Sequence, residues 1–176
     1  MTAKQVAALV VVAFGAGCGS AKTSAWQSFT PETKDFQIHM PSPVKTNVIS
    51  HGPTPDTWTY EASEGEQVRG TLNQYRVMVV LRGKRPATAT EQLDGYRDSE
   101  RNIYPTGNIV KETKIAIGGF PGRELEIEYW SGKQRAFTRV FLANDKSFHL
   151  RVSGDTIKSA SQTEVTTFFE SFKLNP

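Results

Sequence analysis

The sequence predicts an α+β domain in which an antiparallel β-sheet is flanked by helices. Much of the 176-residue chain alternates apolar and polar residues with a period of two, which is typical of strands that bury one face. Glycine and proline separate these segments, and two segments change to near-helical spacing, which indicates amphipathic helices. The formal net charge is only +3 and the charges are interspersed, so we expect no nucleic-acid partner.

The amino-terminal segment ends at the only cysteine of the chain. An apolar run over 6–14 follows one lysine, and small residues then lead to Cys18. The run is shorter than the roughly 20 apolar residues that span a bilayer, but it fits the apolar part of an export signal, about 7–15 residues. Gly15-Ala-Gly-Cys18 resembles the bacterial lipobox, in which the cysteine thiol is joined to diacylglycerol and cleavage falls before the cysteine.

Lipidation at Cys18 would anchor the protein to the bacterial cell envelope, with the membrane as its first partner. Gly15 departs from the lipobox, which usually has leucine there, so ordinary cleavage near Gly19 or Ala21 stays an alternative. Gly19 also stands where an aspartate resembles an inner-membrane retention signal, which favours the outer membrane in a Gram-negative cell. The predicted organisation is a signal peptide over 1–17, a lipidated tether over 18–25 and a single domain over 26–176.

The predicted elements follow from periodicity and turn residues. The first helix can be capped by Thr88 or Thr90, and Pro105 and Gly107 end it. A single cysteine excludes an internal disulfide, so the domain depends on its core. We expect strands over 36–40, 44–50, 57–62, 71–81, 123–130, 134–143 and 147–152, and helices over 88–104 and 158–172.

The strands after residue 123 can be paired through their turns. Ser131-Gly132 is typical of a two-residue hairpin turn. This turn places Glu128 opposite Arg135 and, four residues further along the hairpin, Glu124 opposite Arg139. Each such cross-strand charge pair contributes about 0.2–1 kcal/mol.

The next turn admits two lengths. A three-residue loop over 144–146 places Leu142 opposite Phe148 and gives one coherent apolar face. A two-residue turn would put Phe148 on the same face as Arg135 and Arg139, so we expect the three-residue loop.

With this pairing, the opposite face of the three strands mixes aromatic, basic and acidic residues. The aromatic side chains on this charged face need cover, either from a second helix, such as the one over 158–172, or from a partner. The predicted candidate binding face consists of Trp130, Arg135, Phe137, Arg139, Phe141, His149 and Arg151.

Catalytic and metal-binding patterns are weak in this sequence. The three glutamates of the 123–130 strand have arginines opposite, which favours charge pairs over a paired-carboxylate or metal site. His39, His51 and His149 lack the spacing of metal ligands. The glycine-rich segment 118–122 joins two strands rather than opening a helix, so it is a tight turn. We therefore expect no metal, no cofactor and no catalytic residue.

Several core and turn motifs together resemble the PsbP-like group, which includes many small bacterial lipoproteins. The resemblance covers about 26–176 and implies an α-β-α sandwich with a helix over Trp130 and Phe137. It carries over no catalytic residue and implies a binding or assembly role. The motifs are Phe36-x-Ile38-x-Met40-Pro41, Gly119-Phe-Pro121-Gly122 and Phe168-Phe-Glu-Ser-Phe-Lys-Leu174.

Two functional hypotheses follow. The first is a membrane-anchored, non-enzymatic envelope lipoprotein that binds an unknown envelope protein or ligand. The alternative is a secreted or envelope-associated hydrolase with an unrecognised active site. That site would need a cleft that perturbs an acid or base, around Glu126, His149 or His39.

Overall fold

The computed structural model describes residues 25–52, 56–65, 72–83, 87–103, 107–159 and 162–175. The expected signal peptide and Cys18, with most of the expected tether, lie outside these described residues. Within the described ranges, no helix combines the length and the apolar character that crossing a membrane requires.

Strands dominate the described chain, and two helices interrupt their succession. In chain order the elements are β1 (Trp26–Phe29), β2 (Phe36–Pro41), β3 (Lys45–Ile49), β4 (Thr57–Glu64), β5 (Asn73–Leu81), α1 (Ala89–Ile103), β6 (Asn108–Ile117), β7 (Phe120–Tyr129), β8 (Gln134–Ala143), β9 (Lys146–Gly154), α2 (Thr163–Glu170) and β10 (Lys173–Leu174).

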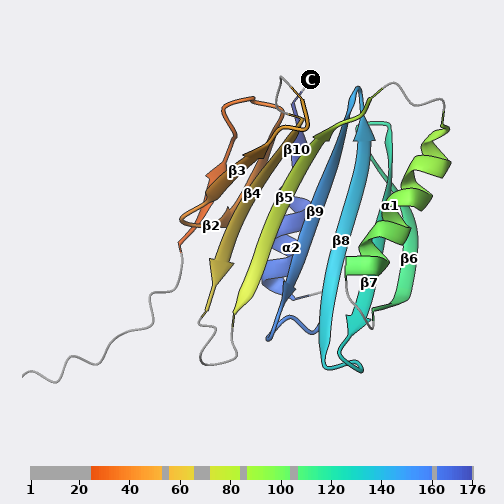
Figure 1. Ribbon diagram of the computed structural model, residues 1–176. Coiled ribbons are helices and arrows are strands. Elements are labelled where there is room, and N and C mark those ends of the chain that lie inside the picture. Colours follow the sequence, from red (N-terminus) through yellow and green to blue (C-terminus); the bar gives the residue numbers. More distant parts are fainter. Residues whose placement is uncertain are drawn as a thin grey trace, which may run out of the picture.

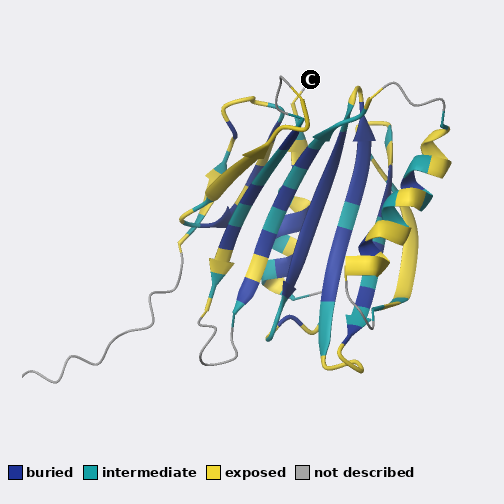
Figure 2. Ribbon diagram, viewed as in Figure 1, coloured by how far each residue is buried: buried dark blue, intermediate teal, exposed yellow. Residues whose placement is uncertain are grey.

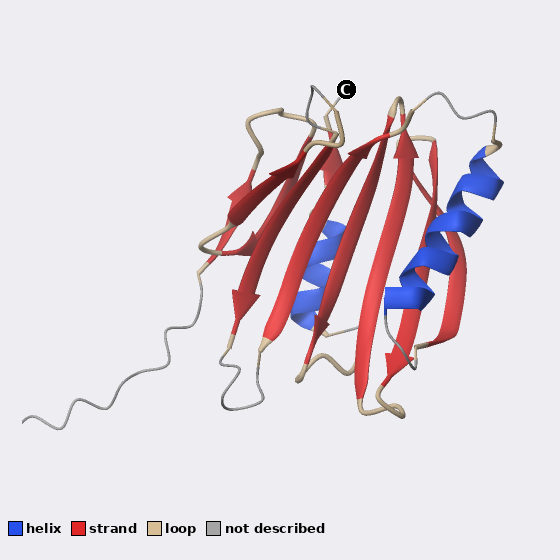
Figure 3. Cartoon of the chain, in the orientation of Figure 1, coloured by secondary structure: helices blue, strands red, loops and turns tan. Residues whose placement is uncertain are grey.

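These elements form three layers (Figure 1, Figure 3). The central sheet of the described chain has seven antiparallel strands in the order β3-β4-β5-β9-β8-β7-β6. α1 covers one face, here called the front, over β7 and β8. α2 and a small sheet, β1-β2-β10, cover the back. The predicted fold class, an antiparallel sheet flanked by helices, is therefore confirmed.

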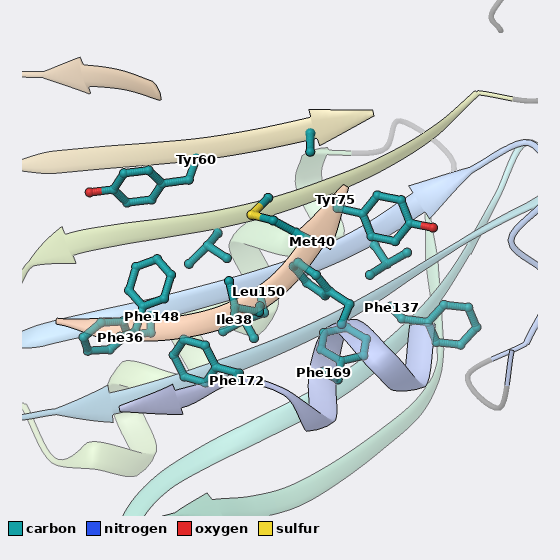
Figure 4. Packing of buried hydrophobic residues seen from close by; sticks show 14 of the residues in the cluster. Phe36, Ile38, Met40, Tyr60, Tyr75, Phe137, Phe148, Leu150, Phe169 and Phe172 are labelled. Carbon is teal, nitrogen blue, oxygen red and sulfur yellow. The ribbon is translucent and has the colours of Figure 1, made fainter. Parts of the chain in front are cut away.

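The main core lies between the central sheet and the back layer (Figure 2, Figure 4). Phe36 of β2 meets Phe148 of β9 with ring centroids 6.3 Å apart, and Phe172 lies 5.5 Å from Phe36. Tyr75 of β5 meets Phe168 of α2 at 5.6 Å. Because successive strand residues point to opposite faces, the period-two pattern brings these aromatic rings to one side of the sheet.

The pairing of β8 with β9 corrects one prediction. The turn has two residues, Asn144 and Asp145, so Phe148 lies opposite Phe141 rather than opposite Leu142. Asn144 adopts a φ of 53°, the left-handed conformation that asparagine tolerates, and this lets two residues close the turn. The expected three-residue loop over 144–146 is wrong by one residue, which exchanges the faces of all β9 side chains.

Most other predicted elements are confirmed. The first hairpin has the predicted register, with Glu128 opposite Arg135, and α1 lies within one residue of the predicted helix over 88–104 at each end. The helix predicted over 158–172 is shorter, since α2 spans Thr163–Glu170. β1, β6 and β10 complete the two sheets, and the sequence pattern defines no bounds for these strands.

Replacing Phe148 by alanine should lower the free energy of unfolding by about 3–5 kcal/mol, because the ring fills space between Phe36 and Phe172. Urea denaturation monitored by circular dichroism measures this change. Val48→Ala on the exposed edge strand β3 is the matched control and should change stability by about 0.5 kcal/mol or less. Equal effects of the two substitutions would contradict the described core.

Candidate functional site

The seven residues of the predicted binding face do not share one face. Trp130 lies at the tip of the β7–β8 hairpin, outside both strands. Because of the two-residue turn, His149 and Arg151 point to the front of the sheet. The other members point to the back, and these are Arg135, Phe137, Arg139 and Phe141.

The back residues other than Arg135 are covered by α2 and by Phe172, which follows it. Phe137 is 2% exposed and Phe141 is 4% exposed, and both belong to the main core (Figure 4 labels Phe137). The predicted helix cover is therefore confirmed for Phe137. Trp130, by contrast, is 60% exposed, so the helix expected above it does not cover it.

The back arginines form the predicted cross-strand pairs. Arg135 donates to Glu126 at 2.6 Å and to Glu128 at 2.5 Å. Arg139 donates to Glu124 at 2.7 Å. Its guanidinium also reaches α2, where it pairs with Glu170 at 2.8 Å and lies 4.8 Å from the centre of the Phe169 ring. These charges join β7, β8 and α2, so they support the fold rather than a catalytic carboxylate pair.

The front residues form a buried polar cluster beneath α1. The Tyr96 ring of α1 stands edge-on to His149, with centroids 4.5 Å apart. Ser147 Oγ lies 3.0 Å from His149 Nε2 and accepts a hydrogen bond from the Tyr96 hydroxyl at 3.1 Å. Arg151 is paired with Glu100 of the same helix. Burial, reinforced by the Arg151 charge, lowers the pKa of His149 from 6.5 to about 3.

A second ionic contact fixes α1 near the outer edge of the sheet. The buried guanidinium of Arg123 on β7 donates to Asp94 of α1 at 2.5 Å and pairs with Glu112 of β6 at 2.8 Å. Its hydrogen bond holds the pKa of Asp94 below the usual range. The front layer is therefore joined to the sheet by polar contacts as well as by the apolar contact of Leu93 with Val140 and Leu142.

The acid and base candidates of the hydrolase hypothesis do not converge. Glu126 is on the back of β7, His149 is buried at the front of β9, and His39 is on the exposed side of β2. His51 pairs instead with Asp56 at 2.9 Å in a surface loop. Among the described residues, no group of three or more His, Cys, Asp or Glu side chains is arranged to hold a metal ion.

A pocket of about 520 Å³ opens at one end of the domain, here called the pocket end. The β6–β7 turn, the β8–β9 turn, the chain before β2 and the carboxyl-terminal residues meet there. This volume falls within the roughly 300–1,000 Å³ that is typical of ligand sites. The pocket is therefore the candidate functional site.

The pocket has an apolar wall and a charged rim. Phe120, Phe148 and Leu174 form the wall. On the rim, Lys146 Nζ pairs with Asp35 at 2.6 Å, and Asp145 projects from the exposed turn. The sequence offers one signal for this site, the glycine pair 118–119, whose positive φ values let the β6–β7 turn close beside the pocket.

The opposite end of the sheet receives the start of the domain, and we call it the Trp26 end. Trp26 packs edge-on against Tyr75 near the start of β5, with centroids 5.0 Å apart. Leu81 at the other end of β5 lies opposite Lys146 of the pocket. Leu81 is the sixth residue after Tyr75, so the two ends lie about 20 Å apart along the strand.

Comparison with known proteins supports the fold. No protein-family model and no curated protein matches the sequence. The solution structure of cyanobacterial PsbP from Synechocystis aligns with a TM-score of 0.58 and 13% identity, over 90% of this chain and 96% of that one. The chain therefore has the PsbP-like α+β fold.

Two solved structures are more distant. The Ran-binding protein Mog1p of Saccharomyces cerevisiae aligns with a TM-score of 0.46 and 13% identity, over 86% of this chain and 96% of that one. LpqN of Mycobacterium tuberculosis, described as involved in cell envelope biogenesis, aligns with a TM-score of 0.40 and 13% identity, over 90% and 88%.

The buried histidine makes stability depend on pH. Below pH 6.5 the unfolded chain binds a proton at His149 that the folded protein does not bind, so stability falls as the pH decreases. Between pH 7 and pH 5 this loss is roughly 2 kcal/mol for one group with such a lowered pKa. Urea denaturation at several pH values should show that the free energy of unfolding of His149→Phe depends less on pH than that of the wild type.

The matched control for this experiment is His39→Gln, which removes a histidine from the exposed side of β2. The control should keep the wild-type profile. A His149→Phe protein that loses stability between pH 7 and pH 5 as steeply as the wild type would contradict the assignment.

Proposed function

We propose that this protein is an exported, lipid-anchored envelope protein that acts as a non-enzymatic binding module through the pocket. The predicted tether enters the domain at Trp26, and the pocket lies at the opposite end of the sheet. This placement is the observation that supports the proposal. Lipidation at Cys18 would hold the Trp26 end near the membrane and leave the pocket accessible to a partner. Gly19 favours the outer membrane for this anchor.

The lining of the pocket indicates the kind of group that it accepts. Its three apolar wall residues suit an aromatic or aliphatic body. Asp35 and Asp145 provide two carboxylates on the rim, and Lys146 provides one ammonium group that is already paired with Asp35. The surplus carboxylate favours a ligand or a partner side chain with an apolar body and a cationic end.

Intact-mass measurement tests the anchor. After expression in a bacterium with lipoprotein processing, the wild-type product should begin at Cys18 and carry the added mass of diacylglycerol and an acyl chain. Cys18→Ala should lack this mass, because the thiol is the attachment point. An unmodified wild-type product cleaved near Ala21 would contradict lipid anchoring.

A pair of probes with the same ring and opposite charges tests the pocket. Tryptamine should shift the backbone amide resonances of Gly118, Gly119 and Asp145 in an NMR titration of the ¹⁵N-labelled Cys18→Ala protein. Indole-3-acetate should bind several-fold more weakly, because its carboxylate meets the acidic rim. Asp145→Asn should reduce the difference in affinity between tryptamine and indole-3-acetate, since it removes the exposed carboxylate of the rim.

Lys133→Gln provides the control for the probe experiment, because this residue lies in the hairpin turn at the Trp26 end. It should leave both titrations unchanged. Equal binding of the two probes, or shifts confined to other parts of the domain, would contradict the proposed pocket chemistry.

A further inference from the structure

Exposed apolar side chains gather at the Trp26 end. Trp130 is 60% exposed at the tip of the β7–β8 hairpin, and Ile103 is 52% exposed at the end of α1. Val110 is 44% exposed at the irregularity near the start of β6. Register places these elements at the Trp26 end, because Asn108 lies opposite Glu128 and the β7–β8 tip follows directly.

Trp130 and Ile103 border the same patch of the front face. Gln74 and Ser153 line a hollow beside Ile103, and the same two residues line a hollow beside Trp130. Gln74 lies opposite Ser153 in the sheet, near the start of β5. The two exposed apolar side chains therefore flank one continuous surface, which we call the Trp130 surface.

The backbone holds Trp130 in an unfavourable conformation. Its φ is 52°, and Ser131 and Gly132 follow with φ values of 56° and 78°. A positive φ is rare for a bulky residue, and such positions concentrate where a side chain serves a function. The Trp130 ring contacts Tyr129 edge-on at 5.8 Å and still leaves most of its surface exposed.

Charges near this surface are mixed. Lys133 and Lys158 are exposed beside the hairpin, where Lys158 Nζ donates to the Lys133 carbonyl oxygen at 3.1 Å. The hollows of the surface are themselves lined by Arg76 and Arg151, which pair with Glu61 and Glu100, and by Asp155. Apolar contact rather than charge would therefore drive binding to a partner at this surface.

We propose that the Trp130 surface lies against the membrane that carries the anchor, with the Trp130 ring among the phospholipid headgroups. This inference rests on the proposed function. Residues 19–25 provide seven residues between Cys18 and Trp26, and these span at most about 25 Å. Tethering at this length keeps the Trp130 surface close to the bilayer, and the amphipathic ring of tryptophan favours the membrane–water interface.

Single-tryptophan fluorescence tests the contact. The described core lies within residues 26–174, so the chain over 18–176 retains it. Its only cysteine is coupled to maleimide-bearing lipids in phosphatidylcholine vesicles. With Trp26→Phe and Trp58→Phe, emission comes from Trp130 alone. Coupling should shift this emission to shorter wavelength, and lipids brominated near the headgroup should quench it more than lipids brominated deep in the acyl chains.

The matched control keeps Trp58 and carries Trp26→Phe and Trp130→Phe. Trp58 lies on the back face of β4, away from the Trp130 surface, so its emission should not respond to coupling or bromine. Replacing part of the phosphatidylcholine by phosphatidylglycerol should leave the Trp130 signal unchanged, because the covalent tether and the apolar side chains of the surface do not require anionic lipid. Circular dichroism checks that both variants are folded.

Unshifted and unquenched Trp130 emission on coupled vesicles would overturn the proposal and favour a protein as the occupant of this surface. Quenching that requires anionic lipid would also overturn it, since charge would then drive the contact. Chemical coupling supplies the anchor whether or not cells lipidate Cys18. Failure here is therefore distinguishable from failure of the native anchor, which intact mass reports.

Discussion

The hydrogen-bond register between β8 and β9 determines how the side chains of the domain are divided between its two faces. β9 lies between β5 and β8, so its register decides which residues meet both neighbours. The two-residue turn at Asn144 and Asp145 sends Phe148, Leu150 and Val152 to the back, and alternation sends Ser147, His149 and Arg151 to the front. A slip of one residue would exchange these two sets and leave neither with suitable partners.

The two faces are consequently held by different interactions. The back layer is a continuous apolar core, in which aromatic rings of β2, β9 and α2 pack together. On the front, Leu93 of α1 packs with Val140 and Leu142, a second apolar cluster lies on β7 and β8, and α1 also depends on buried polar groups. Buried polar groups are stable only when they are paired. Tyr96 provides the hydrogen bond to Ser147, and Glu100 provides the ion pair with Arg151. Changes in protonation therefore act first on the front layer.

The sequence determines much of this arrangement through local signals. Ser131-Gly132 defines the first hairpin, and period-two patterns define the core side of β2 and β5. The second register could not be inferred because both turn lengths suit its sequence. Even with its glutamate partner placed, Arg139 looks incompatible with an aromatic core face until α2 supplies Glu170 and the Phe169 ring. The pocket combines four segments distant in the chain, around 35, 118, 145 and 174, so the one local signal, the glycine pair 118–119, is not enough to reveal it. Burial of His149 likewise depends on packing against α1.

The two proposed contacts restrict each other. If the Trp130 surface lies on the bilayer, the pocket lies at the other end of the strands, about 20 Å away along β5. A tether of seven residues cannot turn the domain over while Trp130 stays among the headgroups. The pocket would then be out of reach of lipids in the same membrane. Its partner would have to extend into the aqueous envelope space, which agrees with a charged rim around an apolar wall.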